Sequence, residues 1–145
     1  MPIFDEAQPR VLVAEDDDSL RRLLELRLSS HGYEVRSAPD GIAAVELLDA
    51  WHPDVALCDV MMPRMSGLSV CREMRERGET AAVPIILLTA RCFDEDIQEV
   101  MALGGIEYVS KPFDWNHLEE LIRVLLGHVE RDAPRVITLT EGTLR

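Results

Sequence analysis

Residues 10–18 read RVLVAEDDD, an apolar and β-branched run that stops at four acidic side chains. Such a run predicts a buried strand that ends in a polar loop. Leucines then recur at helical spacing from Ser19, with charged side chains on the other face, until His31 and Gly32 end the pattern. This stretch therefore predicts a strand followed by an amphipathic helix.

The same alternation of strand and helix continues along the chain. Further strands are predicted at 33–38, 54–58, 84–88 and 108–109, and further helices at 42–48, 67–77, 94–103 and after Asp114. Five strands that alternate with five helices predict an α/β fold, in which right-handed crossovers build a parallel sheet covered by helices on both faces. The 145 residues suffice for one domain of ordinary size.

Composition narrows the class of protein. Hydrophobic residues make up 47% of the chain, which is enough for a core, and the formal net charge is −12. Such an acidic surface repels the phosphate backbone of nucleic acids. We therefore expect no direct nucleic-acid binding by this segment. Neither an apolar run of about 20 residues nor a signal peptide is found, so a cytoplasmic protein without a membrane partner is expected. The scattered Cys58, Cys71 and Cys92 suit reduced thiols.

Polar side chains follow four of the five predicted strands. The first strand ends in Glu15 and Asp16, the third in Asp59 and the fourth in Thr89, and the fifth leads to Lys111. Ligands of open parallel sheets bind beyond the carboxyl ends of the strands, where loops and helix N-termini converge. We therefore expect these five residues to share one site.

This set of residue types favours phosphoryl chemistry with a metal. Clustered carboxylates repel one another unless a cation compensates, and Mg²⁺ is held by carboxylates, carbonyls and water. We expect Asp16, Asp59, the backbone carbonyl of Met61 and a water-linked Glu15 to bind Mg²⁺, for which Mn²⁺ can substitute. Asp59 would be the nucleophile, while the ammonium of Lys111, the hydroxyl of Thr89 and a backbone N–H would neutralise the phosphoryl oxygens.

Four motifs resemble those of response-regulator receiver domains such as the chemotaxis regulators: VLVAEDDD, ALCDVMMPRMSG, IILLTA and YVSKPF. The resemblance covers about residues 10–127. It implies a flavodoxin-like, doubly wound sheet with strand order 2-1-3-4-5 and a signalling domain that promotes only its own phosphorylation and dephosphorylation. Position by position it implies the following roles: Glu15 and Asp16 as the acidic pair, Asp59 as the phosphoacceptor, Thr89 and Ala90 as phosphoryl contacts, Tyr108 as the switch aromatic, Lys111 as the phosphate-contacting lysine, and a cis peptide before Pro112.

The resemblance also implies partners. A sensor histidine kinase or phosphotransfer protein would donate the phosphoryl group, and an output protein or domain would read a change in the face formed by the helix at 94–103, the strand at 108–109 and the last helix. A homodimer through this face is possible. Receivers joined to winged-helix domains usually carry basic residues on this face, but this chain has Ile97, Glu99 and Leu121 instead, which puts that dimer in doubt. Kinase pairing is expected to depend on the surface of the first helix, including Arg21, Arg22 and Leu24.

Two rival functions use a similar architecture. A haloacid-dehalogenase-like phosphatase needs a second aspartate two residues after the nucleophile, where Met61 stands. A flavodoxin-type cofactor carrier needs a Ser/Thr/Gly-rich loop after the first strand, where this chain has acids. The receiver interpretation fits the residues better than either.

The domain boundaries follow from the same pattern. Residues 1–9 are predicted to be an N-terminal extension and residues 10–128 the receiver domain. Residues 129–145 fall outside the alternation and are a tail, a linker or the start of an output domain, so a stand-alone regulator and part of a longer regulator both remain open.

Overall fold

A computed structural model describes residues 8–90 and 95–127. The strands are β1 (Arg10–Ala14), β2 (Glu34–Ala38), β3 (Val55–Asp59), β4 (Ile85–Thr89) and β5 (Ile106–Ser110). The helices are α1 (Asp18–Ser30), α2 (Gly41–Leu48), α3 (Gly67–Glu76), α4 (Glu95–Met101) and α5 (Trp115–Leu125). All strand pairs are parallel and the order is β2-β1-β3-β4-β5, which confirms the predicted fold class.

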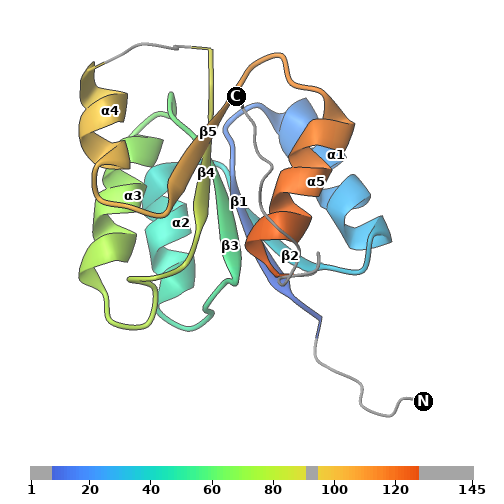
Figure 1. Ribbon diagram of the computed structural model, residues 1–145, viewed down its shortest axis with the longest axis horizontal. Coiled ribbons are helices and arrows are strands. Elements are labelled where there is room, and N and C mark those ends of the chain that lie inside the picture. The colour runs from blue at the N-terminus through green and yellow to red at the C-terminus, as the bar shows by residue number, and fades with distance from the viewer. Residues whose placement is uncertain (1–7, 91–94, 128–145) are drawn as a thin grey trace.

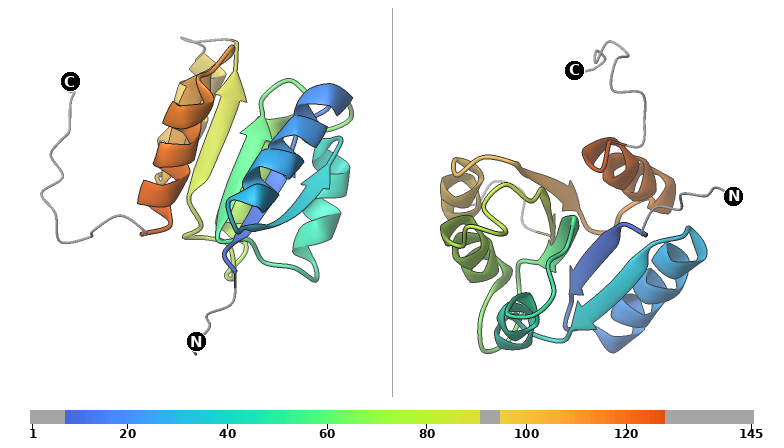
Figure 2. Two further views of the ribbon diagram at one scale, coloured as in Figure 1. Left: turned by 90° about the vertical axis from the view of Figure 1, so that its right-hand side faces the viewer. Right: turned by 90° about the horizontal axis from the view of Figure 1, so that it is seen from below.

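The sheet separates two layers of helices, with α1 and α5 on one face and α2, α3 and α4 on the other (Figures 1 and 2). Strand side chains alternate between these layers, as the pleat requires. In β1, Val11 and Val13 pack with α1 and α5, whereas Leu12 and Ala14 pack with α2 and α3. Because both faces are covered, β1, β3 and β4 are apolar along almost their whole length.

Side chains at the helix N-termini fix where the helices begin. The Asp17 carboxylate accepts a hydrogen bond from the backbone N–H of Leu20 at 3.0 Å, so α1 starts one residue before the predicted Ser19. Asp114 caps α5 through the N–H of Asn116, as predicted. Asp40 and Ser66 cap α2 and α3 in the same way.

The structure extends β3 and β5 beyond their predicted limits. Asp59 is the last residue of β3 and is paired with Leu88, although the strand was predicted to end at Cys58. β5 spans five residues where two were predicted, because the ladder to β4 runs from Ile106 to Ser110. The polar residues in this edge strand had hidden it in the sequence.

Two side chains face differently from the prediction. Leu24, predicted to lie on the kinase-facing surface, is 1% exposed in the core beneath α1, while Leu23 is 47% exposed. Ile97 was also predicted to lie on the surface, at the dimer face, but it is 1% exposed and packs among residues of α3 and the sheet. Helical spacing alone does not decide which of two adjacent leucines faces the sheet.

Several predictions fall on other parts of the chain. Residues 1–7, Cys92, the predicted helix start at Asp94 and the segment 128–145 lie outside the described residues. Cys58 and Cys71 are buried free thiols, as expected. Among the described residues, every helix is too short or too polar to cross a membrane.

Candidate functional site

The carboxyl ends of three adjacent strands bring buried polar side chains to one edge of the sheet. Glu15 follows β1, Asp59 ends β3 and Thr89 ends β4, and their exposed fractions are 0%, 5% and 1%. They are the buried polar or charged residues of this edge, whereas Asp16 beside them is exposed. The topology thus gathers the residues that the sequence analysis selected.

The three carboxylates of this edge form one acidic cluster. Glu15, Asp16 and Asp59 each offer an oxygen within 4.8 Å of the others. Burial and then repulsion from Glu15 raise the pKa of Asp59 from 3.8 to about 7, although the positive charge of Lys111 acts in the opposite direction. Such a cluster favours either a bound proton or a bound cation.

Lys111 reaches the cluster from the end of β5. Its Nζ lies 3.0 Å from Oε1 of Glu15 and 3.3 Å from Oδ1 of Asp59. Its backbone N–H donates to the carbonyl of Thr89 at 2.8 Å, so the lysine backbone is held against the end of β4. Burial lowers the pKa of Lys111, but the hydrogen bond to Glu15 and the charge of Asp59 outweigh burial and raise it. The predicted cis peptide joins Lys111 to Pro112.

The donor set fits a divalent cation. All candidate ligands are oxygens, the preferred ligands of Mg²⁺. Oε2 of Glu15 accepts the N–H of Asp17 at 3.1 Å, and Oε1 accepts from Lys111, so both oxygens of this buried carboxylate already have protein partners. Asp16 and Asp59 are therefore the better candidates for direct ligands, and Glu15 for a contact through water.

Two glycines allow the loop after β3 to pack tightly beside the site. A Cβ on Gly67 would lie 2.2 Å from the carbonyl oxygen of Asp59, and a Cβ on Gly41 would lie 2.2 Å from that of Met65. Gly67 also donates its N–H to the carbonyl of Val60 at 3.1 Å. This role of Gly67 could not be predicted from the motif that contains it, because the contact depends on how α3 docks against β3.

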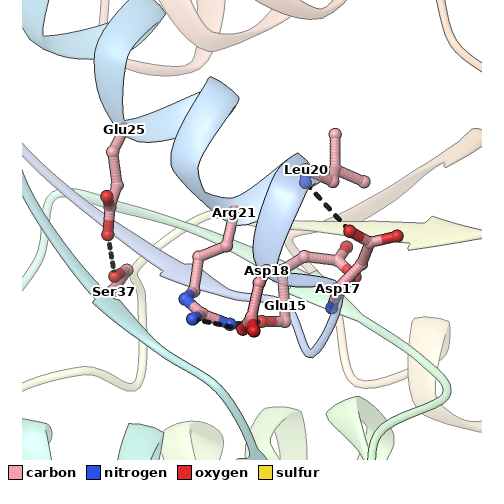
Figure 3. Close-up of polar contacts among 7 residues, drawn as sticks. All are labelled: Glu15, Asp17, Asp18, Leu20, Arg21, Glu25 and Ser37. Carbon is pink, nitrogen blue, oxygen red and sulfur yellow. Dashed lines mark hydrogen bonds and ion pairs between the residues drawn. The ribbon is translucent and has the colours of Figure 1, made fainter.

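The loop after β1 is held by α1 (Figure 3). Nη1 of Arg21 donates to the backbone carbonyl of Glu15 at 2.9 Å, and its Nη2 donates to the carboxylate of Asp18 at 2.7 Å. Glu25, one turn further along α1, accepts a hydrogen bond from the hydroxyl of Ser37 on β2, and this contact links α1 to β2. The sequence predicted Arg21 only as a residue of the kinase-facing surface.

The predicted switch residues occupy two different environments. Thr89 is buried, Ala90 is exposed, and Tyr108 is 36% exposed on β5. Tyr108 borders a surface hollow of about 390 Å³ between β5 and α5, which is lined by Tyr108, Val109, Ser110, Pro112, Phe113, Asp114 and His117. Met61, whose carbonyl is a predicted ligand, has a side chain that is 59% exposed.

Comparisons with known proteins show what the chain is similar to. The family model for the response regulator receiver domain matches residues 11–123. The probable transcriptional regulator ycf27 of Galdieria sulphuraria is 43% identical over 122 residues, which cover 84% of this chain and 47% of that protein. The response regulator MprA of Mycobacterium avium is 40% identical over 140 residues, which cover 93% and 60%. The chain thus spans about half the length of the curated relatives it matches.

Solved structures show the same fold. The chemotaxis protein CheY4 of Vibrio cholerae superposes with a TM-score of 0.76 at 31% identity, covering 82% of this chain and 99% of that one. The receiver domain of the sensor histidine kinase PA1611 of Pseudomonas aeruginosa, which has a magnesium ion in its active-site cleft, superposes with a TM-score of 0.75 at 32% identity, covering 83% and 99%.

Proposed function

This chain belongs to the response regulator receiver domain family, and we propose that it accepts a phosphoryl group on Asp59 in a Mg²⁺-dependent reaction. The observation that carries the proposal is the position of Asp59, which lies between two other carboxylates and the ammonium of Lys111. The family has a signalling role and is not a class of conventional enzymes. The phosphoryl group would therefore serve as a signal.

The residues around Asp59 have complementary roles in this proposal. A carboxylate oxygen of Asp59 forms the bond to phosphorus while the bond from phosphorus to the donor breaks. Lys111 and the Thr89 hydroxyl, with the N–H of Ala90, neutralise the phosphoryl oxygens, where most of the charge resides. Nζ of Lys111 lies 3.3 Å from the Asp59 carboxylate, which supports a position of the ammonium beside the transferred phosphoryl group.

The acidic cluster would hold the ion. Asp16, Asp59 and the carbonyl of Met61 would be direct ligands, and Glu15 would act through water, with Mn²⁺ as a substitute for Mg²⁺. When bound, the ion neutralises charge on the carboxylates and on a phosphoryl oxygen. The magnesium ion in the related PA1611 receiver domain supports this proposal.

Phosphorylation would shift an equilibrium between two conformations. The hydroxyl of Thr89 would move toward the phosphoryl group, and Tyr108 would turn inward into the space that it leaves. The surface formed by α4, β5 and α5 would then change shape, and an output protein or domain, or a second copy of the chain, would read the change. The partial exposure of Tyr108 supports its place on this surface.

The partners and domain limits belong to the same proposal. A sensor histidine kinase or phosphotransfer protein would supply the phosphoryl group. Residues 10–128 would form the receiver, after an N-terminal extension at 1–9, and residues 129–145 would be a tail, a linker or the start of an output domain. The similarity to longer regulators, which for MprA extends over 140 residues, supports a link to an output domain. The cytoplasmic location stays a prediction.

Mass spectrometry tests the central step. The chain is incubated with acetyl phosphate and Mg²⁺ and then weighed, and the expected result is a gain of one phosphoryl group. The gain should be absent in Asp59→Asn and present in the control Asp49→Asn, which removes an exposed carboxylate that pairs with Arg77 far along the chain. A phosphorylated Asp59→Asn variant would disprove the assignment of Asp59.

A further inference from the structure

Arg21 connects the first turn of α1 to the acidic loop. Its guanidinium donates to the backbone carbonyl of Glu15 at 2.9 Å and to the carboxylate of Asp18 at 2.7 Å (Figure 3). Its side chain is only 20% exposed, while that of Asp18 is 87% exposed. Arg21 is thus a largely buried positive charge. Its backbone contact lies at Glu15, the first residue of the loop after β1, next to the proposed metal ligand Asp16.

The carbonyl that Arg21 binds belongs to the peptide group between Glu15 and Asp16. A peptide group is planar, so holding its carbonyl fixes the plane and limits the direction of the next side chain. The following peptide group is held as well, because the N–H of Asp17 donates to the carboxylate of Glu15 at 3.1 Å. Asp16 therefore lies between two fixed peptide groups, although it is itself exposed.

We propose that Arg21 is a positioning residue for the metal site, which orients the carboxylate of Asp16 toward the ion by holding the Glu15–Asp16 peptide group. The inference rests on the function proposed above and adds a residue that touches neither the ion nor the phosphoryl group. Groups that orient metal ligands contribute strongly to affinity, typically by about 10–100-fold.

Electrostatics and positioning make opposite predictions for the loss of Arg21. A positive charge near a cation site repels the ion, so its removal should strengthen metal binding if charge were the only effect. Loss of orientation should weaken binding. The sign of the change therefore separates the two effects without any assumption about their size.

Arg22 provides a matched control on the same helix. It is exposed and forms no hydrogen bond or ion pair with any residue that the structure describes. Arg22→Ala removes the same charge from the same part of α1 and keeps the Arg21 contacts. Arg21→Lys keeps the charge, but one ammonium group cannot reproduce the fork that joins Glu15 to Asp18.

The experiment titrates Mn²⁺ into the full chain and follows the free ion by electron paramagnetic resonance. The expected dissociation constant rises about tenfold in Arg21→Ala, rises less in Arg21→Lys and changes less than about twofold in Arg22→Ala. Thermal unfolding without metal identifies folded variants. If Arg21→Ala does not fold, the titration of Arg21→Lys decides.

A second measurement separates positioning from general damage to the fold. Phosphorylation by acetyl phosphate is followed as Mg²⁺ is varied. Positioning predicts a higher half-saturating Mg²⁺ concentration with the maximal rate retained, whereas a damaged fold lowers the maximal rate.

Unchanged or tighter Mn²⁺ binding in a folded Arg21 variant would overturn the inference and leave the proposed function intact. A lower maximal rate with an unchanged half-saturating concentration would also overturn it. A wild-type chain that binds no Mn²⁺ would remove the metal part of the proposed function and the inference with it.

Discussion

Asp59 is placed where its own charge is unfavourable. The side chain is almost fully buried beside Glu15, and the single ammonium of Lys111 contacts both carboxylates. Burial and the charge of Glu15 together raise the pKa of Asp59 to about 7. In the absence of an ion, ionised Asp59 therefore destabilises the folded state, and a bound cation would relieve this strain.

This effect predicts that Asp59→Asn stabilises the metal-free protein. The folded-state pKa is about 7 and the ordinary pKa is 3.8, so folding is accompanied by proton uptake between these values. The unfavourable contribution of Asp59 is thus absent below the ordinary pKa and complete above the folded-state pKa. Urea unfolding with a chelator should show a gain of up to about 4 kcal/mol near pH 8, which disappears near pH 4.

Asp49→Asn is the control for this comparison. Asp49 is exposed and pairs with Arg77 at 3.0 Å, so the same chemical change should alter the free energy of unfolding by less than about 1 kcal/mol. An Asp59→Asn variant that is no more stable than wild type near pH 8 would show that Lys111 fully compensates the carboxylate.

At the scale of elements, the contact between the start of α3 and the end of β3 sets the position of Asp59. Gly67 approaches so closely that a Cβ would lie 2.2 Å from the carbonyl oxygen of Asp59. The overlapping atom belongs to the backbone, so a rotamer change cannot relieve it. Gly67→Ala is therefore expected to lower the free energy of unfolding by about 3 kcal/mol and to weaken Mn²⁺ binding.

Gly78→Ala tests whether the loss of any glycine has this effect. Gly78 lies in the loop between α3 and β4, and an added Cβ would have no heavy atom within 4 Å. The substitution should leave Mn²⁺ binding unchanged and change stability by no more than about 1 kcal/mol. Equal effects of the two substitutions on metal binding would disprove the close contact as the cause.

A second connection between elements lies at the other end of the strands, near their amino termini. The guanidinium of Arg75 on α3 donates to the carbonyls of Gly104, Gly105 and Thr80 at 3.1–3.2 Å. It thereby ties α3 to the loop between α4 and β5, and burial lowers the pKa of Arg75. The surface that is proposed to change on phosphorylation is thus fixed to α3 at one end.

Arg75→Met is expected to loosen this loop. Three carbonyls lose a charged donor, which should lower the free energy of unfolding by about 2 kcal/mol. Hydrogen exchange should become faster at Gly104, whose N–H donates to Met101. The control Arg72→Met removes an exposed ion pair with Glu99 at 3.7 Å, and exchange should be unchanged. Unaltered exchange in Arg75→Met would exclude this connection.

For the whole molecule, topology explains which features the sequence could predict. Parallel strands end at one edge, so Glu15, Asp59 and Lys111 were predictable as neighbours once five alternating units were recognised. The burial of Leu24 and Ile97 was not predictable, because it depends on how each helix is rotated about its axis against the sheet. The contacts of Arg21 and Gly67 depend on the distance between elements, which no spacing in the sequence records.

The ion and the fold should be linked in the molecule as a whole. The chain carries a net charge of −12, and the proposed metal site gathers three of its carboxylates. A ligand that binds only the folded state stabilises it by about 2.7 kcal/mol when its concentration is 100 times the dissociation constant. We therefore expect Mg²⁺ to raise the unfolding temperature more than NaCl at equal ionic strength.

This rise should depend on pH and on Asp16. Because the pKa of Asp59 is about 7, the ion must displace a proton at lower pH, and the rise should be smaller near pH 6 than near pH 8. In Asp16→Asn the rise should fall to that caused by NaCl, because one of the two expected direct carboxylate ligands is lost. Differential scanning calorimetry measures all three effects. If Mg²⁺ and NaCl stabilise the wild-type chain equally, the ion acts only by screening the acidic surface, and the carboxylates at the end of the sheet do not form a metal site.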